Sequence, residues 1–370
     1  MADCASVWLT CRHPDVSHVV SRAAVHAITD DSNGTYLKLI FKTLTAIDAG
    51  VRAGKWPSPR NVAELDCVLV AIIDDFIYAQ KLHSWVGERL HAAWSHVFSN
   101  MTSRLPNFSR AVVGWRSLVV PTERFGMCRE RWAAIARFLF ETAVTVIDWQ
   151  SGLWWSLQCD TYGREQDMEL LRHSTADIAV AERQGRTCIA LFFGVPERGE
   201  TVKTSLQLPN QGVTIDADWV ASIFRTWLKR VPEGNKVFSI SKQQVVLRVR
   251  KAVAALDLED DDAILHRLRH TGAANDVAES SLRKPDAAEA NFEETRRRGN
   301  VPRSLEEARR RGRWLHMSSL QRYTKTAHLV ADLGKLPDRT RRYGEDFLAS
   351  PLSFISPPPA GRVSFAAPLL

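Results

Sequence analysis

The chain has 370 residues, of which 45% are hydrophobic and 25% charged, a composition typical of a soluble globular protein with room for two domains. Lysine and arginine number 49 against 42 aspartates and glutamates, and the resulting net charge of +7 permits a polyanionic partner without requiring one. The six cysteines form no CxxC pair, which argues against a disulfide framework or a zinc site, and the N-terminus has no signal-peptide pattern. The most hydrophobic stretch, 132–157, contains Arg137, Glu141 and Asp148, which excludes a membrane span.

The first third of the chain is predicted to be a leader followed by a helical domain. Residues 1–34 lack clear periodicity and end in the turn-like DDSNG, so we expect a leader there. From Tyr36 onward apolar residues recur at helical spacing, and Asn61 stands where the second helix needs an N-cap. We therefore predict a small domain of about four helices over 35–121.

A second domain is predicted over 122–334, and its residue pattern changes twice. It opens with RERWAAIARFLFETAVTVIDW, which indicates one long buried helix. Over 176–216 short β-prone runs alternate with Gly, Pro and Asn turns, which is typical of a small antiparallel sheet. Helices resume from Ala217, and 335–370 is predicted to be a proline-rich, disordered tail. The predicted fold class is therefore mainly α with a small antiparallel β-sheet, an α+β fold.

The stretch LHRLRHTGAAND, residues 265–276, places four cation-capable side chains within six positions. On a helix, His266 and Arg269 stand three residues apart and share a face. A face that carries both suits an anionic partner, and the competing interpretation is the solvated start of a basic helix.

Another basic stretch, RRRGRWLHMSSLQRYTKTAHL, begins at residue 309 and contains Trp314 and Tyr323. On one unbroken helix nine steps would put these two residues on opposite faces. A turn must therefore intervene if they are to converge, and HMSS is a suitable segment for it.

In this order, the two stretches resemble the second half of the active site of the tyrosine recombinase, or phage integrase, superfamily, which includes the Cre-like enzymes. The matching elements are His266-x-x-Arg269 followed by HTGA, then Gly-Arg-Trp314, then Tyr323. The ending RGRW…RY is most similar to the eukaryotic mobile-element members of the superfamily.

The rest of the family's order nominates two residues further upstream. TYGREQDMELL resembles the first-arginine box and nominates Arg164, with Asp167 in the acidic position. ETVKTSLQLP lies between two β-prone runs, where the family has a lysine on a hairpin, and nominates Lys203. Together the resemblance covers roughly residues 36–332.

The resemblance implies a helical core-binding domain followed by a tyrosine recombinase catalytic domain, with six site residues. Two arginines would hold the nonbridging phosphoryl oxygens, because a planar guanidinium binds them in a bidentate manner. A tyrosine would be the nucleophile, a lysine the general acid, a histidine a proton acceptor or hydrogen-bond donor, and an indole N–H a further donor. In this sequence these are Arg164 and Arg269, then Tyr323, Lys203, His266 and Trp314.

The same resemblance implies the partners and the absence of cofactors. The phosphotyrosyl bond stores the energy of the broken linkage, so neither a metal nor a cofactor is expected. The partner would be double-stranded DNA, and four strand ends are joined in recombination, so we expect a homotetramer on DNA and no membrane partner. The expected location is intracellular, and nuclear if the source is eukaryotic.

Competing interpretations exist for the residues and for the function. Arg172 in LLRHS competes with Arg164, Lys203 could be an exposed hairpin lysine, and Trp314 is one of 12 tryptophans that could simply be core. Tyr323 could belong to an ordinary amphipathic helix. The functional alternatives are a catalytically inactive DNA-binding descendant of a mobile element, a type IB topoisomerase, and a helical scaffold protein with chance motifs.

Overall fold

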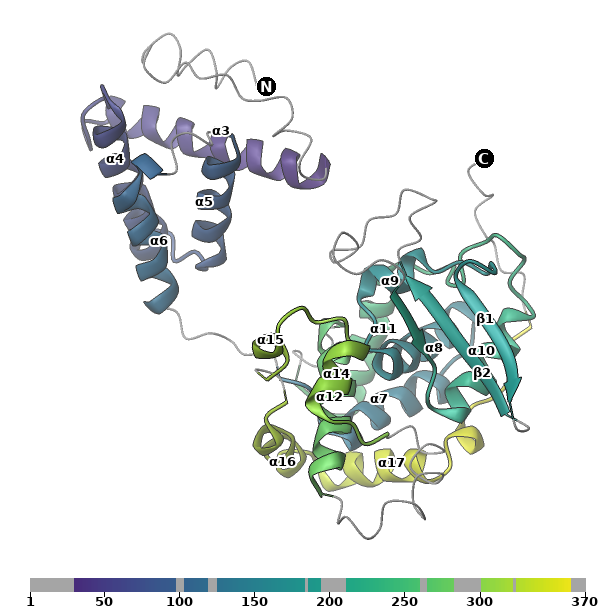
Figure 1. Cartoon of the computed structure of the whole chain (residues 1–370). Coiled ribbons are helices and arrows are strands. Elements are labelled where there is room, and N and C mark those ends of the chain that lie inside the picture. The colour runs from purple at the N-terminus through teal and green to yellow at the C-terminus, as the bar shows by residue number, and fades with distance from the viewer. Residues whose placement is uncertain are drawn as a thin grey trace. The chain divides into compact units, whose positions relative to one another are not determined.

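The computed structural model describes residues 30–97, 103–118, 125–183, 186–193, 211–259, 265–282, 301–321 and 324–360. Within these residues the protein is mainly helical with one three-stranded antiparallel sheet (Figure 1), so the predicted fold class is confirmed. The chain divides between Thr122 and Glu123 into two compact units, which we call the N-terminal and C-terminal units. Among the described residues, no helix is long and apolar enough to cross a bilayer.

The described residues of the N-terminal unit form four α-helices and one π-helical turn around an apolar core of their own. Asn61 caps the second helix as predicted, and its side chain accepts from the Glu64 N–H at 2.9 Å. The buried Asp66 carboxylate accepts from the Asn107 and Phe108 N–H groups at 3.0 and 2.8 Å, which joins the second helix to the fourth. The elements are α3 (Asp30–Arg52), α4 (Val62–Asp74), η2 (Asp75–Ala79), α5 (Trp85–Val97) and α6 (Pro106–Leu118).

The start of α3 corrects the predicted leader boundary. The helix begins at Asp30, so DDSNG forms its first turn and a half, where a turn at the end of the leader was expected. The prediction of a leader is therefore wrong for residues 30–34, and residues 1–29 lie outside the described residues.

The single long helix predicted at the start of the C-terminal unit is two helices, α7 (Arg129–Glu141) and α8 (Val146–Thr161). Thr145 separates them because its side chain accepts from the Asp148 N–H, while the Asp148 carboxylate accepts from the Thr145 N–H at 3.0 Å. This reciprocal capping box begins a new helix inside a continuous apolar run. Nearly every residue of α8 is buried, so it is the central helix of the unit.

The sheet consists of β1 (Ile178–Arg183), β2 (Arg186–Phe193) and β3 (Gln211–Thr214) in the order β1-β2-β3, all antiparallel. Alternate residues of β2, namely Ile189, Leu191 and Phe193, are buried, so one face of the sheet packs on the core. The helices α10 (Asp218–Leu228) and α11 (Lys242–Ala255) complete this part of the unit (Figure 1).

Four short or medium helices carry the motifs singled out in the sequence: α9 (Glu165–Leu170), α12 (His266–Leu282), α14 (Leu305–Arg311) and α15 (Met317–Gln321). The chain leaves helical structure at 312–316, between α14 and α15, and Arg313 has a φ of +57° there. The break therefore lies earlier than the HMSS segment in which the turn was predicted: of its four residues only His316 is outside a helix, because Met317, Ser318 and Ser319 belong to α15.

The predicted disordered tail is wrong for the described residues beyond 335. After α16 (Thr326–Gly334) the chain forms α17 (Asp338–Ala349) and a 3-10 turn, η7 (Pro351–Phe354). Figure 1 shows α17 beside α7, and Phe347 is fully buried against Trp219 with ring centroids 5.4 Å apart. Gly344 permits this approach, because a Cβ there would lie 2.1 Å from the Glu130 carbonyl oxygen. The prediction was based on the prolines of the tail and missed the apolar face of α17, which is buried only when it packs against α7.

Candidate active site

Arg269 stands one turn into α12 and is almost completely buried, with 3% of its surface exposed. Its Nη1 donates to the main-chain carbonyl of Tyr162 at 3.0 Å, and its Nη2 donates to the carbonyl of Gly312. The Trp314 ring covers the guanidinium, with 4.3 Å between Cζ and the ring centroid. Arg269 thereby joins the ends of α8 and α14, which lie 107 and 43 positions away in the chain.

Two histidines extend this stack toward the surface. His266 is exposed at the first position of α12, and its ring meets His270 edge-on with centroids 4.9 Å apart. His270 is buried and stacks on Trp314 at 6.1 Å. Burial lowers the pKa of His270 to about 2, with further lowering by the neighbouring His266 and Arg269 charges, so His270 is neutral in the folded protein.

Arg164 occupies the N-cap position of α9, directly after the turn that ends α8. Its main-chain N–H donates to the Asp167 carboxylate at 2.7 Å. Burial lowers the pKa of Arg164, Asp167 acts in the opposite direction, and the positive charge of Arg313 lowers it further. The guanidinium remains charged at neutral pH. Its Nη1 is buried and has no hydrogen-bond partner among the described residues. A buried donor without a partner is costly, and a bound anion would satisfy it.

Arg313 connects the first-arginine box to the segment that holds Trp314. Its guanidinium pairs with the Asp167 carboxylate, and both side chains are buried. The guanidinium also lies 4.7 Å from the ring centroid of Phe193 on β2. Asp167 therefore receives the N–H of Arg164 and the side chain of Arg313, which places the two arginines on the same carboxylate.

Four of the six predicted site residues are described and are connected by these contacts. Arg269 and Trp314 touch directly, His266 reaches them through His270, and Arg164 reaches the Trp314 segment through the Asp167–Arg313 pair. Lys203 and Tyr323 lie outside the described residues.

The competing arginine lies elsewhere in the C-terminal unit. The Arg172 guanidinium donates to the Gly234 carbonyl at 3.2 Å, and its main chain forms a bridge with Lys236. The main-chain N–H of Arg172 donates to the Asp177 carboxylate at 2.8 Å, so Arg172 contacts Asp177 and the loop after α10, whereas the Arg164 N–H contacts Asp167.

Three residues of this arrangement were not singled out by the sequence patterns. His270 had a usable signal, because it directly follows Arg269 in the same basic stretch, and Arg313 had one in RGRW. Tyr162 had none, because its role depends on a left-handed residue with a φ of +51° at the end of α8.

No protein-family model matches the chain, and a comparison with curated proteins found no match either. Within the described ranges, no group of three or more histidine, cysteine or acidic side chains is arranged to hold a metal ion. The function is therefore inferred from the side chains and their arrangement.

Proposed function

We propose that the protein breaks and rejoins DNA strands as a tyrosine recombinase of the mobile-element type, through a covalent phosphotyrosyl intermediate. The observation that carries the proposal is that Arg164, Arg269 and Trp314, far apart in sequence, belong to one connected cluster that contains a buried guanidinium nitrogen with no partner among the described residues. Such a cluster suits a phosphate group better than a neutral ligand.

The arginines would act on the charge that develops during strand cleavage. The phosphoryl group becomes crowded and carries its negative charge on the nonbridging oxygens. Arg164 would donate to one of these oxygens through its Nη1, and Arg269 would bind another. Because an arginine cannot lose its proton, both groups would stay cationic throughout the reaction. Trp314 would hold the Arg269 guanidinium in place and donate its indole N–H.

The covalent step would involve the remaining residues of the set. The Tyr323 hydroxyl oxygen attacks phosphorus, and the bond from phosphorus to the 5′ oxygen breaks. Lys203 gives a proton to the departing 5′ oxygen, and His266 accepts the phenol proton or donates a hydrogen bond to the phosphate. Rejoining is the reverse of these steps, so no metal or other cofactor is consumed.

DNA binding in this proposal depends mainly on phosphate contacts by lysine and arginine. The net charge of +7 supports such contacts, and the affinity should fall steeply as salt rises. The working form would be a homotetramer that holds two DNA sites. The protein would act inside the cell, and in the nucleus if its source is eukaryotic.

A second candidate, a catalytically inactive DNA-binding descendant, is favoured by one specific observation. Arg269 is 3% exposed, and both of its terminal nitrogens donate to main-chain carbonyls. Each terminal nitrogen carries a second N–H, but a phosphoryl oxygen would have to enter this nearly closed site before Arg269 could stabilise a transition state. A protein in which the site stays closed to phosphate would bind DNA without cleaving it.

The test is a DNA duplex with a nick close to the cleavage point, which traps a covalent adduct because the short leaving strand diffuses away. We expect the full chain to form an adduct that resists denaturation and that disappears in Tyr323→Phe. Tyr343→Phe is the matched control, since it removes the same hydroxyl from α17, where it bonds to Glu141. An adduct that survives Tyr323→Phe contradicts the nucleophile assignment.

The same preparation separates the other candidates. Salt-sensitive DNA binding without any adduct supports the inactive descendant. Relaxation of supercoiled plasmid by a monomer, without pairing of two sites, supports a type IB topoisomerase. An absence of salt-sensitive DNA affinity would leave only a scaffold role.

A further inference from the structure

Tyr162 lies at the point where α8, α12 and the Trp314 segment meet. It ends α8 in a left-handed conformation and is 1% exposed. Its carbonyl accepts from Arg269 Nη1 at 3.0 Å, while its hydroxyl donates to the carboxylate of Asp276, about two turns beyond Arg269 on α12. Its ring packs in one apolar cluster with Trp314 and with Leu320 of α15. The main chain of Tyr162 therefore contacts Arg269 of the candidate site, while its side chain contacts the Trp314 segment and Asp276.

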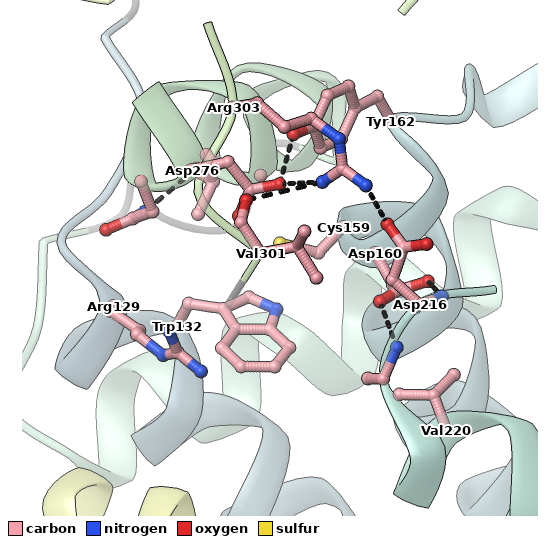
Figure 2. Close-up of a pocket in the computed structure, with 14 residues that line it drawn as sticks. Arg129, Trp132, Cys159, Asp160, Tyr162, Asp216, Val220, Asp276, Val301 and Arg303 are labelled. Carbon is pink, nitrogen blue, oxygen red and sulfur yellow. Dashed lines mark hydrogen bonds and ion pairs between the residues drawn. The ribbon is translucent and has the colours of Figure 1, made fainter. Parts of the chain in front are cut away.

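The Asp276 carboxylate that receives the Tyr162 hydroxyl belongs to a buried network of charges. Figure 2 shows Arg303 between the carboxylates of Asp276 and Asp216, and both pairs are ion pairs. Arg311 pairs with Asp216 at 2.8 Å and donates to the main-chain carbonyl of Asp160 at 2.7 Å. The guanidinium groups of both arginines also lie over the Tyr162 ring, at 6.0 and 5.2 Å from its centroid.

This network attaches the segment 301–314 to the rest of the C-terminal unit, in addition to the Arg269–Gly312 and Arg313–Asp167 contacts. Arg303 precedes α14 and Arg311 ends it, and Trp314 follows three residues later. The cavity beside the network has a volume of only about 30 Å³, roughly the space of one water molecule. Because Tyr162 and Asp276 are both buried, bulk solvent has little access to a partner left unpaired, so each contact of the network constrains the segment.

We propose that Tyr162 is a positioning residue of the candidate site. Its carbonyl holds Arg269, and its ring packs against the Trp314 segment. Its hydroxyl bonds to Asp276, which in turn pairs with Arg303 of that segment. Its hydroxyl sets the orientation of the carboxylate that binds Arg303, so its loss would loosen 301–321 while the carbonyl contact to Arg269 remains. The effect on catalysis rests on the proposed function, whereas the effect on the segment does not.

The test compares Tyr162→Phe with Tyr343→Phe in the full chain, because each change removes one hydroxyl that bonds to a carboxylate, in different parts of the unit. Amide hydrogen exchange of the free protein should become roughly tenfold faster in peptides covering 301–321 for Tyr162→Phe, as expected for the loss of a buried hydrogen bond to a charged group. Tyr343→Phe should leave these peptides unchanged. Equal effects of the two changes, or no effect of Tyr162→Phe on 301–321, would overturn the proposal.

A second variant and a second readout keep the two proposals distinguishable. Arg303→Lys keeps the charge but cannot bind two carboxylates through a planar fork, so it should also accelerate exchange in 301–321. With nicked DNA at saturation, Tyr162→Phe should form adduct about tenfold more slowly than wild type, with an unchanged Kd for DNA. If wild type forms no adduct while exchange in 301–321 responds as expected, the recombinase function fails and the positioning role stands.

Discussion

Gly272 is where the packing of α12 against α8 can be tested most directly. It lies on α12 three residues after Arg269, against the end of α8. A Cβ added there would be 2.2 Å from the Cys159 carbonyl oxygen and 2.7 Å from the Tyr162 ring. Because the nearest atom belongs to the backbone, rotation of a side chain cannot relieve the contact. An ordinary contact begins at 3.4 Å, so the helices would have to separate by 3.4 minus 2.2, about 1.2 Å.

The expected cost of Gly272→Ala follows from this displacement. Overpacking of a core by one methyl group typically costs about 1–3 kcal/mol, and a rigid backbone contact belongs at the upper end. The better helix propensity of alanine returns up to about 1 kcal/mol. We therefore expect a net loss of about 2 kcal/mol, which lowers the Tm of a unit of this size by roughly 4–8 °C.

The assay is calorimetry of the full chain, with Gly334→Ala as the matched control in the same unit. Gly334 ends α16, and a Cβ there meets nothing within 4 Å, so this variant should be as stable as wild type or slightly more stable. If the protein cleaves DNA, a displacement of this size should also slow adduct formation by about 100-fold. A Gly272→Ala protein that melts with wild type would refute the close helix contact.

Three further predictions concern the buried charges and the C-terminal helix. Asp167→Ala removes the carboxylate that pairs with the buried Arg313, so the free energy of unfolding in urea should fall by about 3–5 kcal/mol, and a loss below about 1 kcal/mol would contradict this pairing. Phe347→Ala opens a cavity between α17 and Trp219, so the free energy of unfolding in urea should fall by about 3–5 kcal/mol. Unchanged stability would mean that α17 is not part of the folded unit. Burial raises the pKa of Asp276 from 3.8 to about 6, so the folded state binds its proton more tightly than the unfolded state. The free energy of unfolding should therefore fall as pH rises from about 4 through 6, by on the order of 3 kcal/mol from this group. Urea unfolding at several pH values measures this, and Asp276→Asn should flatten that part of the profile. The same slope in the variant would contradict the raised pKa of Asp276.

Local patterns were sufficient for most of the secondary structure. Helical spacing of apolar residues, the Asn61 cap and the alternation along 186–193 each act over a few neighbouring residues, and the structure has the corresponding helices and strand. The mistakes arose where a local signal was misjudged. Thr145 begins a new helix within a continuous apolar run, and DDSNG begins a helix instead of ending a leader.

The two arginine motifs show how much of the candidate site could be predicted from the sequence. The spacing of His266 and Arg269 on one helix is a local property and could be predicted from residues 265–276 alone. The family resemblance nominated Arg164, but no local pattern distinguishes its surroundings from those of Arg172. The Arg164 N–H meets Asp167 locally, three residues away, whereas only the fold brings Arg313 to that carboxylate and Arg172 to the Gly234 carbonyl.

The sequence by itself indicated most of the helices and strands, a length sufficient for two domains and a set of candidate phosphate-binding residues. Only the tertiary structure decided that Tyr162 supports Arg269 and Trp314 at once, and that α17 packs on α7. The physical reason is that element formation depends on neighbours within one or two turns, whereas these contacts depend on which faces of distant helices can approach closely. Positions such as Gly272 and Gly344, where a single methyl group would prevent the approach, make that decision.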